Sequence, residues 1–351
     1  MADGSKIEWT DATWNVVIGC DKVSPGCDHC YAIRTAHRMQ ANPNPVISAA
    51  YAGTEADGDW TGRVNLVTDR LDLPLKWRRP RRIFVNAQSD LFHDQVPDEF
   101  IARVWAVMAS APRHTFQVLT KRHGRMRSLL SSEEFRLAVQ RRIPHAGASP
   151  YAAAYWKTWP LPNVWLGVSV EDQQRANLRI PALLDTPAAV RWISAEPLLG
   201  PVSLFANTKL DNGTLLDWVV VGGESGPGAR PMHPAWARAL RYECTTNGIP
   251  FLFKQWGDWG PAPWGVERHP DETLPDYRAR AEAGCATHVI TNPLPDGSWG
   301  LYEPDYKPWS AESGALPQEY AQGAVRRWGK RTAGRVLDGR TWDEYPAAAD
   351  G

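Results

Sequence analysis

Short apolar runs alternate with longer amphipathic runs along most of the chain, and this alternation is typical of a parallel α/β fold. Seven apolar runs have the length and composition of buried strands, and they lie at 13–18, 82–86, 115–120, 164–170, 190–195, 216–221 and 250–253. Apolar residues at helical spacing predict helices at 31–39, 66–77, 97–109, 124–130, 173–184 and 234–247. Residues 40–65 have no clear period and are expected to form a surface loop.

The order of these elements favours a barrel. No glycine-rich dinucleotide fingerprint follows the first strand, so an open doubly wound sheet fits less well. We therefore predict a TIM-like barrel, partial or full, of six to seven parallel strands. Residues 1–257 would form this barrel, with an insertion at about 131–162 where the alternation is lost.

Residues 258–351 differ in character from the rest, because Pro, Gly and Trp abound and strand patterns are short. We expect a loop-rich C-terminal appendage. The basic run at 326–331 allows two interpretations. It is either a solvated surface of a segment that packs on the barrel, or part of a lid in which Lys330 and Arg331 meet a phosphate or carboxylate. Charge runs are usually solvated, which favours the first interpretation.

The most distinctive chemistry lies between the first strand and the first helix. Cys20, Cys27 and Cys30 place three of the five cysteines within eleven residues, in the pattern Cys-x6-Cys-x2-Cys. The Pro25-Gly26 pair predicts a turn between the first cysteine and the other two. Three thiolates on a strand-to-helix loop are the ligands that an iron–sulfur cluster with one open iron needs.

Two other interpretations of these cysteines stay open. A structural zinc ion usually has four ligands, and the fourth would be His29, His37 or Cys244. Incidental thiols with no ligand are the remaining choice. A disulfide framework fits poorly, because five cysteines are an odd number and few for 351 residues.

Polar residues follow every predicted strand, and in a parallel barrel these positions share the C-terminal rim, where active sites lie. Beyond the cysteines, the candidates on this rim are Ser89, Asp90, Lys121, Arg122, Ser169, Glu171, Glu196, Glu224 and Lys254. For any one of these residues, a purely structural role is a strong alternative. Asp90 or Glu171 could simply stabilise the start of the next helix.

Bulk composition narrows the class of protein. Acidic and basic residues balance at 39 each, so no global charge favours nucleic acid, although a local basic site stays open. The start of the chain lacks an apolar signal core, and no apolar run approaches transmembrane length. We expect a soluble, cytoplasmic protein with reduced thiols and no membrane partner. The 18 tryptophans fit either packing or stacking against flat ligands and bases.

Several further motifs accompany the cysteine loop. They are Ser-Asp-Leu-Phe-His at 89–93, Trp-Leu-Gly-Val-Ser-Val-Glu-Asp at 165–172, Glu-Pro-Leu-Leu-Gly at 196–200, Val-Gly-Gly-Glu-Ser-Gly at 221–226, Lys-Gln-Trp-Gly at 254–257 and the tail at 334–342. Together they resemble a family of phage-borne and bacterial proteins, and the resemblance covers nearly the whole chain.

That family is similar, in turn, to divergent radical S-adenosylmethionine enzymes, in which three cysteines after the first barrel strand hold a 4Fe–4S cluster. The resemblance implies that Cys20, Cys27 and Cys30 are the cluster ligands and that the open iron binds S-adenosylmethionine. The pattern departs from the commonest one. Six residues rather than three separate the first two cysteines, and Gly222-Gly223-Glu224 follows the sixth strand rather than the second.

The resemblance also suggests roles for the rim residues. Ser89 and Asp90 occupy the matching position after the second strand and are the candidates for binding the amino group of the cofactor. Arg122, Ser169 and Glu224 complete the predicted cofactor-binding set. The residues predicted to be catalytic by positioning cofactor and substrate are Lys121, Glu171, Glu196 and Lys254.

The function implied is that of a radical enzyme. An electron donor such as a flavodoxin or ferredoxin would reduce the cluster, and the adenosyl radical would take hydrogen from a substrate. The substrate class stays open among nucleic acid, peptide and small metabolite. The alternative is a non-catalytic zinc-binding protein that binds nucleic acid or another partner, using its tryptophans and the basic run at 326–331.

Overall fold

The sheet at the centre of the molecule has seven parallel strands. The computed structural model describes residues 4–5, 7–143, 158–204, 216–261, 288–293, 299–302 and 324–347. The strands follow one another across the sheet in chain order: β1 (Ala12–Trp14), β6 (Arg82–Val85), β7 (Thr115–Thr120), β8 (Val164–Ser169), β9 (Val190–Ala195), β10 (Trp218–Gly222) and β11 (Phe251–Gln255). Every neighbouring pair is parallel.

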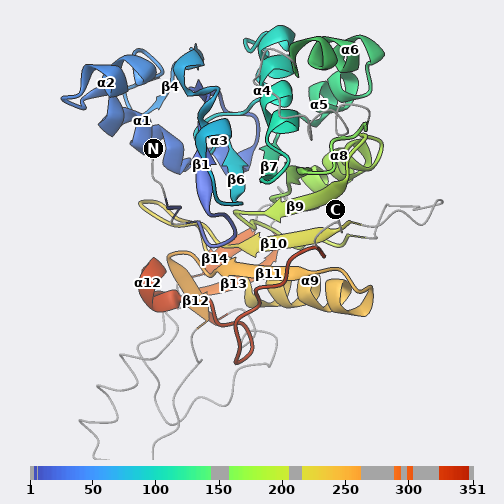
Figure 1. Ribbon diagram of the computed structural model, residues 1–351. Helices are drawn as coiled ribbons and strands as arrows, with labels where there is room; N and C mark the ends of the chain where they lie inside the picture. Colours follow the sequence, from blue (N-terminus) through green and yellow to red (C-terminus); the bar gives the residue numbers. More distant parts are fainter. Residues whose placement is uncertain are drawn as a thin grey trace, which may run out of the picture.

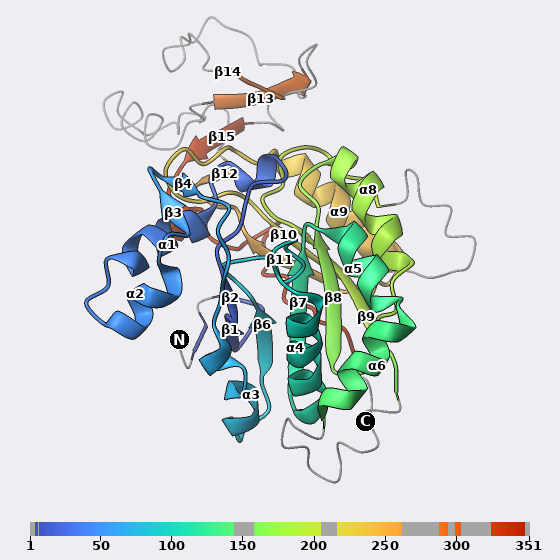
Figure 2. The same ribbon diagram turned by 90° about the horizontal axis from the view of Figure 1, so that it is seen from above.

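The sheet curls into a half barrel and stays open, with β1 and β11 at its edges (Figures 1 and 2). The predicted parallel α/β fold is therefore confirmed in its partial form, and the closed barrel is wrong. The helices between the strands lie on the convex face. They are α4 (Asp98–Ser110), α5 (His123–Leu130), α6 (Glu133–Arg142), α8 (Gln173–Leu184) and α9 (Pro234–Thr246).

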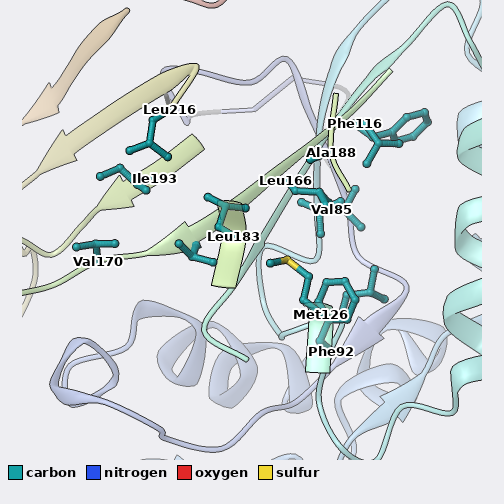
Figure 3. Packing of buried hydrophobic residues seen from close by; sticks show 14 of the residues in the cluster. Val85, Phe92, Phe116, Met126, Leu166, Val170, Leu183, Ala188, Ile193 and Leu216 are labelled. Atoms are coloured by element: carbon teal, nitrogen blue, oxygen red, sulfur yellow. The ribbon is translucent and has the colours of Figure 1, made fainter. Parts of the chain in front are cut away.

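Alternation along each strand divides the core into two parts. In β7, Phe116 and Val118 belong to the main cluster under the helices, whereas Leu119 packs on the opposite face. Figure 3 shows part of the main cluster, where Leu166 of β8 lies near Val85 of β6, and Met126 of α5 lies near Phe92. The predicted insertion begins with α6, which adds buried apolar side chains to this cluster, and residues 144–157 lie outside the described part.

The concave face is filled by tryptophan. Trp192 and Trp218 are fully buried side by side, with ring centroids 5.3 Å apart, and Trp9 lies 5.2 Å from Trp192. Gly167 of β8 leaves the space that the Trp192 indole occupies, since a β-carbon there would lie 2.4 Å from the ring. Packing, rather than stacking against flat ligands, therefore accounts for these three tryptophans.

The first predicted strand, 13–18, breaks into two. β1 pairs with β6, but β2 (Val17–Ile18) leaves the sheet and pairs antiparallel with β5 (Asn65–Leu66). Asn86 accounts for the break: it adopts a left-handed conformation (φ 58°), and its Oδ1 accepts hydrogen bonds from the backbone N–H groups of Val16 (3.0 Å) and Val17 (3.2 Å).

Two predictions for residues 40–77 are wrong. Part of the expected loop is helix α2 (Pro45–Tyr51), which packs against α1 (Tyr31–Gln40) and is followed by the hairpin β3 (Glu55–Ala56) and β4 (Asp59–Trp60). Asn44 caps α2 by accepting from the Val46 N–H at 3.0 Å, with Pro45 in the first turn. The expected helix at 66–77 is broken into the short turns η2 (Thr68–Arg70) and α3 (Leu73–Lys76), because Pro74 cannot continue a helix from before it.

A C-terminal segment, residues 342–345, covers the β11 edge. The Phe253 N–H donates to the Trp342 carbonyl at 2.9 Å, and the Glu344 N–H donates to the Phe251 carbonyl at 3.3 Å. Tyr345 then packs its ring against Trp218 (5.3 Å) and its hydroxyl donates to the Glu8 carbonyl at 3.3 Å. This segment, called the edge strap below, therefore ties β11 to the N-terminal residues.

A second sheet is built from β12 (Trp259–Pro261), β15 (Ala324–Arg327), β13 (His288–Pro293) and β14 (Trp299–Tyr302), which pair antiparallel in that order. The short helix α12 (Lys330–Ala333) follows β15. Residues 262–287, 294–298, 303–323 and 348–351 of the expected appendage lie outside the described part of the chain. Across the described part of the chain, no helix has the length and apolarity needed to cross a membrane.

Candidate site at the cysteine loop

The three clustered cysteines lie on one loop, residues 19–30, which is called the cysteine loop below. It runs from β2 to α1, and Gly19 bridges to Ser89 beyond the end of β6. All three thiols are free and half-buried, and Cys30 forms the N-cap of α1. Burial raises the pKa of Cys20 to about 12, with the Asp90 carboxylate adding to the effect, and burial also raises the pKa of Cys30. Cys20 and Cys30 are therefore protonated at neutral pH unless a metal displaces the proton.

Two cations from the end of β7 approach the sulfur atoms. Arg122 donates from Nη1 to Cys20 Sγ at 3.7 Å and pairs with Asp21. Lys121 donates to Ser169 Oγ at 3.0 Å and lies 3.4 Å from Glu171. Burial works to lower the pKa of Lys121, but Glu171 and the nearby thiols of the loop more than offset this and raise it. Lys121 is therefore a cation at neutral pH, beside the second and third cysteines.

Glu171, which follows β8, is fully buried beneath the loop. Its carboxylate accepts from Ser24 Oγ at 2.7 Å and from Arg179 at 2.9 Å. Burial would raise the pKa of Glu171, but Lys121, Arg179 and Ser24 outweigh it, so the pKa is lowered. Gly26 rests directly on this carboxylate, because a β-carbon there would lie 2.5 Å from Glu171 Cγ. Glu171 thus supports the turn that precedes Cys27.

Glu224, which follows β10, meets the other side of the same turn. It accepts from the Arg230 side chain at 2.7 and 2.9 Å, and from His29 Nδ1 at 3.0 Å. Burial would raise the pKa of Glu224, but the bonds from Arg230 and His29 keep it lowered. Arg230 also donates to the Pro25 carbonyl at 2.8 Å and to Asp28 at 3.0 Å.

Ser89 and Asp90 are engaged within the protein. Ser89 Oγ donates to the Val17 carbonyl at 2.7 Å. Asp90 is buried and accepts from Thr120 Oγ1 at 2.7 Å and from the Lys121 backbone N–H at 2.9 Å. Asp90 therefore joins the loops that follow β6 and β7, and it holds Lys121 in register with the cysteine loop.

Glu196 and Lys254 form another ion pair at the strand ends, with Lys254 Nζ donating to Glu196 Oε1 at 2.5 Å. Both side chains keep some exposure, 18 % and 14 %. Tyr31, which directly follows Cys30, is 51 % exposed, and its hydroxyl donates to the Ala87 carbonyl. Glu196, Lys254 and Tyr31 thus keep some exposure, whereas Glu171 is fully buried.

The suggested fourth zinc ligands have other roles. His29 Nδ1 is bonded to Glu224, His37 Nδ1 is 3.0 Å from Glu55, and Cys244 is buried in α9. Within the described ranges, no three His, Cys, Asp or Glu side chains are grouped so as to hold one metal ion. A zinc ion needs each sulfur within about 2.3 Å, whereas a cluster takes each thiolate on a different iron. The three thiols on the loop are free, and Arg122 and Lys121 lie beside them.

Sequence reasoning missed four residues that organise this loop: Ser24, Tyr31, Arg179 and Arg230. Arg179 stands eight residues after Glu171, on the second turn of α8, and Arg230 stands six residues after Glu224. Neither spacing is a recognised motif. Tyr31 carried a usable signal, because it follows the last cysteine directly and begins the helix.

The fold and site define an α/β protein with a three-cysteine loop at the carboxyl end of a parallel half barrel. The chain belongs to the family described as "Protein of unknown function (DUF5131)", whose model matches residues 4–346. No curated protein and no solved structure matches it.

Proposed function

We propose that this protein is a radical S-adenosylmethionine enzyme whose 4Fe–4S cluster is held by Cys20, Cys27 and Cys30. The observation that carries the proposal is the position of the three free thiols: they lie on one loop after the first strand, at the carboxyl edge of seven parallel strands. When bound, such a cluster supplies the electron that cleaves a carbon–sulfur bond of S-adenosylmethionine.

The residues around the loop support this donor set. Thiols must lose their protons to bind iron, and Arg122 and Lys121 place two positive charges beside the resulting thiolates. Their charge lowers the cost of gathering three thiolates in a partly buried place. The Trp192 and Trp218 indoles fill the interior below, so a reacting ligand would be confined to the rim and shielded from water on that side.

Glu196, Lys254 and Tyr31 are the groups suited to contact a ligand, because Tyr31 is exposed and the Glu196–Lys254 pair is partly accessible. Glu196 and Lys254 neutralise each other, and a zwitterionic or polar ligand can take over either partner. Glu171 and Glu224 have their oxygens engaged by Ser24, Arg179, Arg230 and His29. We therefore assign these two carboxylates to the support of the loop, and the partly accessible pair Glu196–Lys254 to the ligand.

Anaerobic reconstitution tests the proposal. The full chain is purified without oxygen and supplied with iron and sulfide, and iron content and electron paramagnetic resonance are recorded with and without S-adenosylmethionine. About four irons per chain are expected, with a spectrum that the cofactor alters. Cys27→Ala should lose the cluster, while the matched Cys244→Ala variant, in α9, should retain it.

Two results would overturn the proposal. The first is full iron, sulfide and visible absorption in Cys27→Ala, which would show that the ligand assignment is wrong. The second is tightly held zinc with no cluster in the wild-type chain, which would favour the zinc-binding alternative. Salt-dependent binding to DNA or RNA would then be measured.

A further inference from the structure

Arg230 connects the turn of the cysteine loop to the end of β10. Its guanidinium donates to both oxygens of Glu224, at 2.7 and 2.9 Å, and its backbone N–H donates to the same carboxylate at 2.8 Å. Glu224 is only 7 % exposed, so these charge-assisted bonds form where water competes little. Glu224 therefore fixes the orientation of the Arg230 guanidinium group independently of its bonds to the loop.

The remaining donors of Arg230 end on the loop itself. One goes to the Pro25 carbonyl at 2.8 Å and another to Asp28 at 3.0 Å, on either side of Cys27. His29 adds a third attachment, because its Nδ1 lies 3.0 Å from Glu224, and its ring lies where a β-carbon on Gly228 would come within 3.2 Å of it. Three of the residues between Ser24 and Cys30 are thus held by one pair of side chains.

The support behind Glu224 is rigid. Its backbone carbonyl accepts from the Asp258 N–H at 2.9 Å, and the chain passes so close that a β-carbon on Gly257 would lie 2.0 Å from that carbonyl. The Asp258 carbonyl in turn accepts from the Trp328 and Gly329 N–H groups at 2.9 Å. The loop is therefore braced, through Glu224, by the β12–β15 pair of the second sheet.

We propose that Arg230 is the positioning residue that fixes Cys27 and Cys30 before any metal binds. The opposite end of the loop has a separate anchor, Arg122 on Cys20, so the two ends can loosen independently. We call the bonds that join Arg230 and Glu224 to Pro25, Asp28 and His29 the lock. Its role in binding a cofactor rests on the proposed function. Its existence does not, because all the bonded residues belong to the metal-free chain.

Thiol alkylation tests the lock. The reduced, metal-free chain is pulsed with iodoacetamide and digested with trypsin. Cleavage after Lys22 and Arg34 separates the peptide with Cys27 and Cys30 from the peptide with Cys20. In Arg230→Gln, Cys27 and Cys30 should be alkylated about tenfold faster than in the wild type, since bonds to a charged group are lost. Cys20 and Cys244 should keep their wild-type rates.

Two further variants make the test specific. Arg136→Gln removes a surface ion pair with Glu133 on α6 and should leave every rate unchanged. Arg230→Lys keeps the charge but lacks the planar fork, so its rates should fall between wild type and Arg230→Gln. The proposal would be overturned if Cys27 and Cys30 were alkylated in Arg230→Gln at their wild-type rates. A parallel rise at Cys244 would do so too, because it would show general unfolding.

Iron uptake separates this inference from the proposed function. If the wild-type chain takes up no cluster but Arg230→Gln shows the local increase, the lock stands and the proposed function fails. If the chain takes up its cluster and the variant shows no local increase, the proposed function stands and the lock fails.

Discussion

Replacing Gly167 by alanine should destabilise the whole protein, although it adds only one methyl group. Gly167 lies in the middle of β8, facing Trp192 of β9. The new β-carbon would lie 2.4 Å from Trp192 Cε2 and 2.6 Å from its Nε1. Carbon atoms in contact prefer about 3.5–4.0 Å, so the indole must move by about 1 Å or more.

The indole has no easy direction of movement. Its exposed fraction is 0 %, and the Trp9 and Trp218 rings lie 5.2 and 5.3 Å from it. Overpacking of a filled core costs about 1–3 kcal/mol, and we expect the upper part of that range because the neighbours are themselves packed aromatic rings. Urea unfolding followed by circular dichroism measures the loss as a lower midpoint.

A second background isolates the cause. In Trp192→Phe the smaller ring leaves room, so adding Gly167→Ala there should cost less than in the wild type, and the double-mutant cycle should show a coupling of about 1 kcal/mol or more. The matched control is Gly124→Ala in α5, where a β-carbon meets nothing within 4 Å and stability should be unchanged or higher by up to about 1 kcal/mol. A Gly167→Ala midpoint equal to wild type would refute the steric reasoning.

Three further predictions concern the loop, its support and the edge strap. Gly26→Ala should lower bound iron after reconstitution, with little change in unfolding midpoint, because the methyl group would push the loop off Glu171. Glu171→Gln should destabilise the protein more at pH 7 than at pH 4. The pKa of Glu171 is lowered in the folded state, so the carboxylate stabilises the fold at pH values above its unfolded-state pKa of about 4.3. This stabilisation is lost as the pH falls through the folded-state pKa. Tyr345→Ala should cost about 1–3 kcal/mol in urea unfolding, since the ring packs on Trp218 and under Arg82, whereas Tyr345→Phe should cost about 1 kcal/mol or less.

Each of these has a clear contrary result. Wild-type iron content in Gly26→Ala would mean that the loop tolerates displacement. A Glu171→Gln penalty that stays constant from pH 7 to pH 4 would mean that the native carboxylate is not stabilised as its contacts indicate. Equal losses in Tyr345→Ala and Tyr345→Phe would assign the effect to the hydroxyl and not to the ring.

The sheet could be predicted because its information is local. The runs at 115–120 and 190–195 are apolar and flanked by polar turns, and β7 and β9 have those bounds. The run at 173–184 has helical spacing after the capping residue Asp172, and α8 has those bounds although Pro181 lies inside it. Curvature is different. Whether seven parallel strands close depends on the edges, and covering of β11 by residues 342–345 is a contact across about ninety residues of sequence.

Residues 40–77 and the side chains that support the cysteine loop show what could not be predicted from the sequence. The cap of α2 by Asn44 and Pro45 was readable, but no apolar period made it stand out. Pro74 contradicted a continuous helix at 66–77 and outweighed the periodicity. At the cysteine loop, the polar positions that follow predicted strands included Glu171 and Glu224, yet the sequence could not show that arginine side chains enclose both carboxylates. That distinction depends on Arg230 and Pro25 meeting across 205 positions.

The order of strands across the sheet has a consequence for synthesis on the ribosome. Because each strand pairs with the one made before it, the sheet can grow in step with the emerging chain, one βα unit at a time. During this growth the newest strand always presents an open row of backbone donors and acceptors. β11 keeps that row until residues 342–345 have left the exit tunnel and paired with it. Chains that end between β11 and the edge strap would therefore keep an unpaired strand edge, and we expect them to be the species most prone to aggregate or to recruit chaperones.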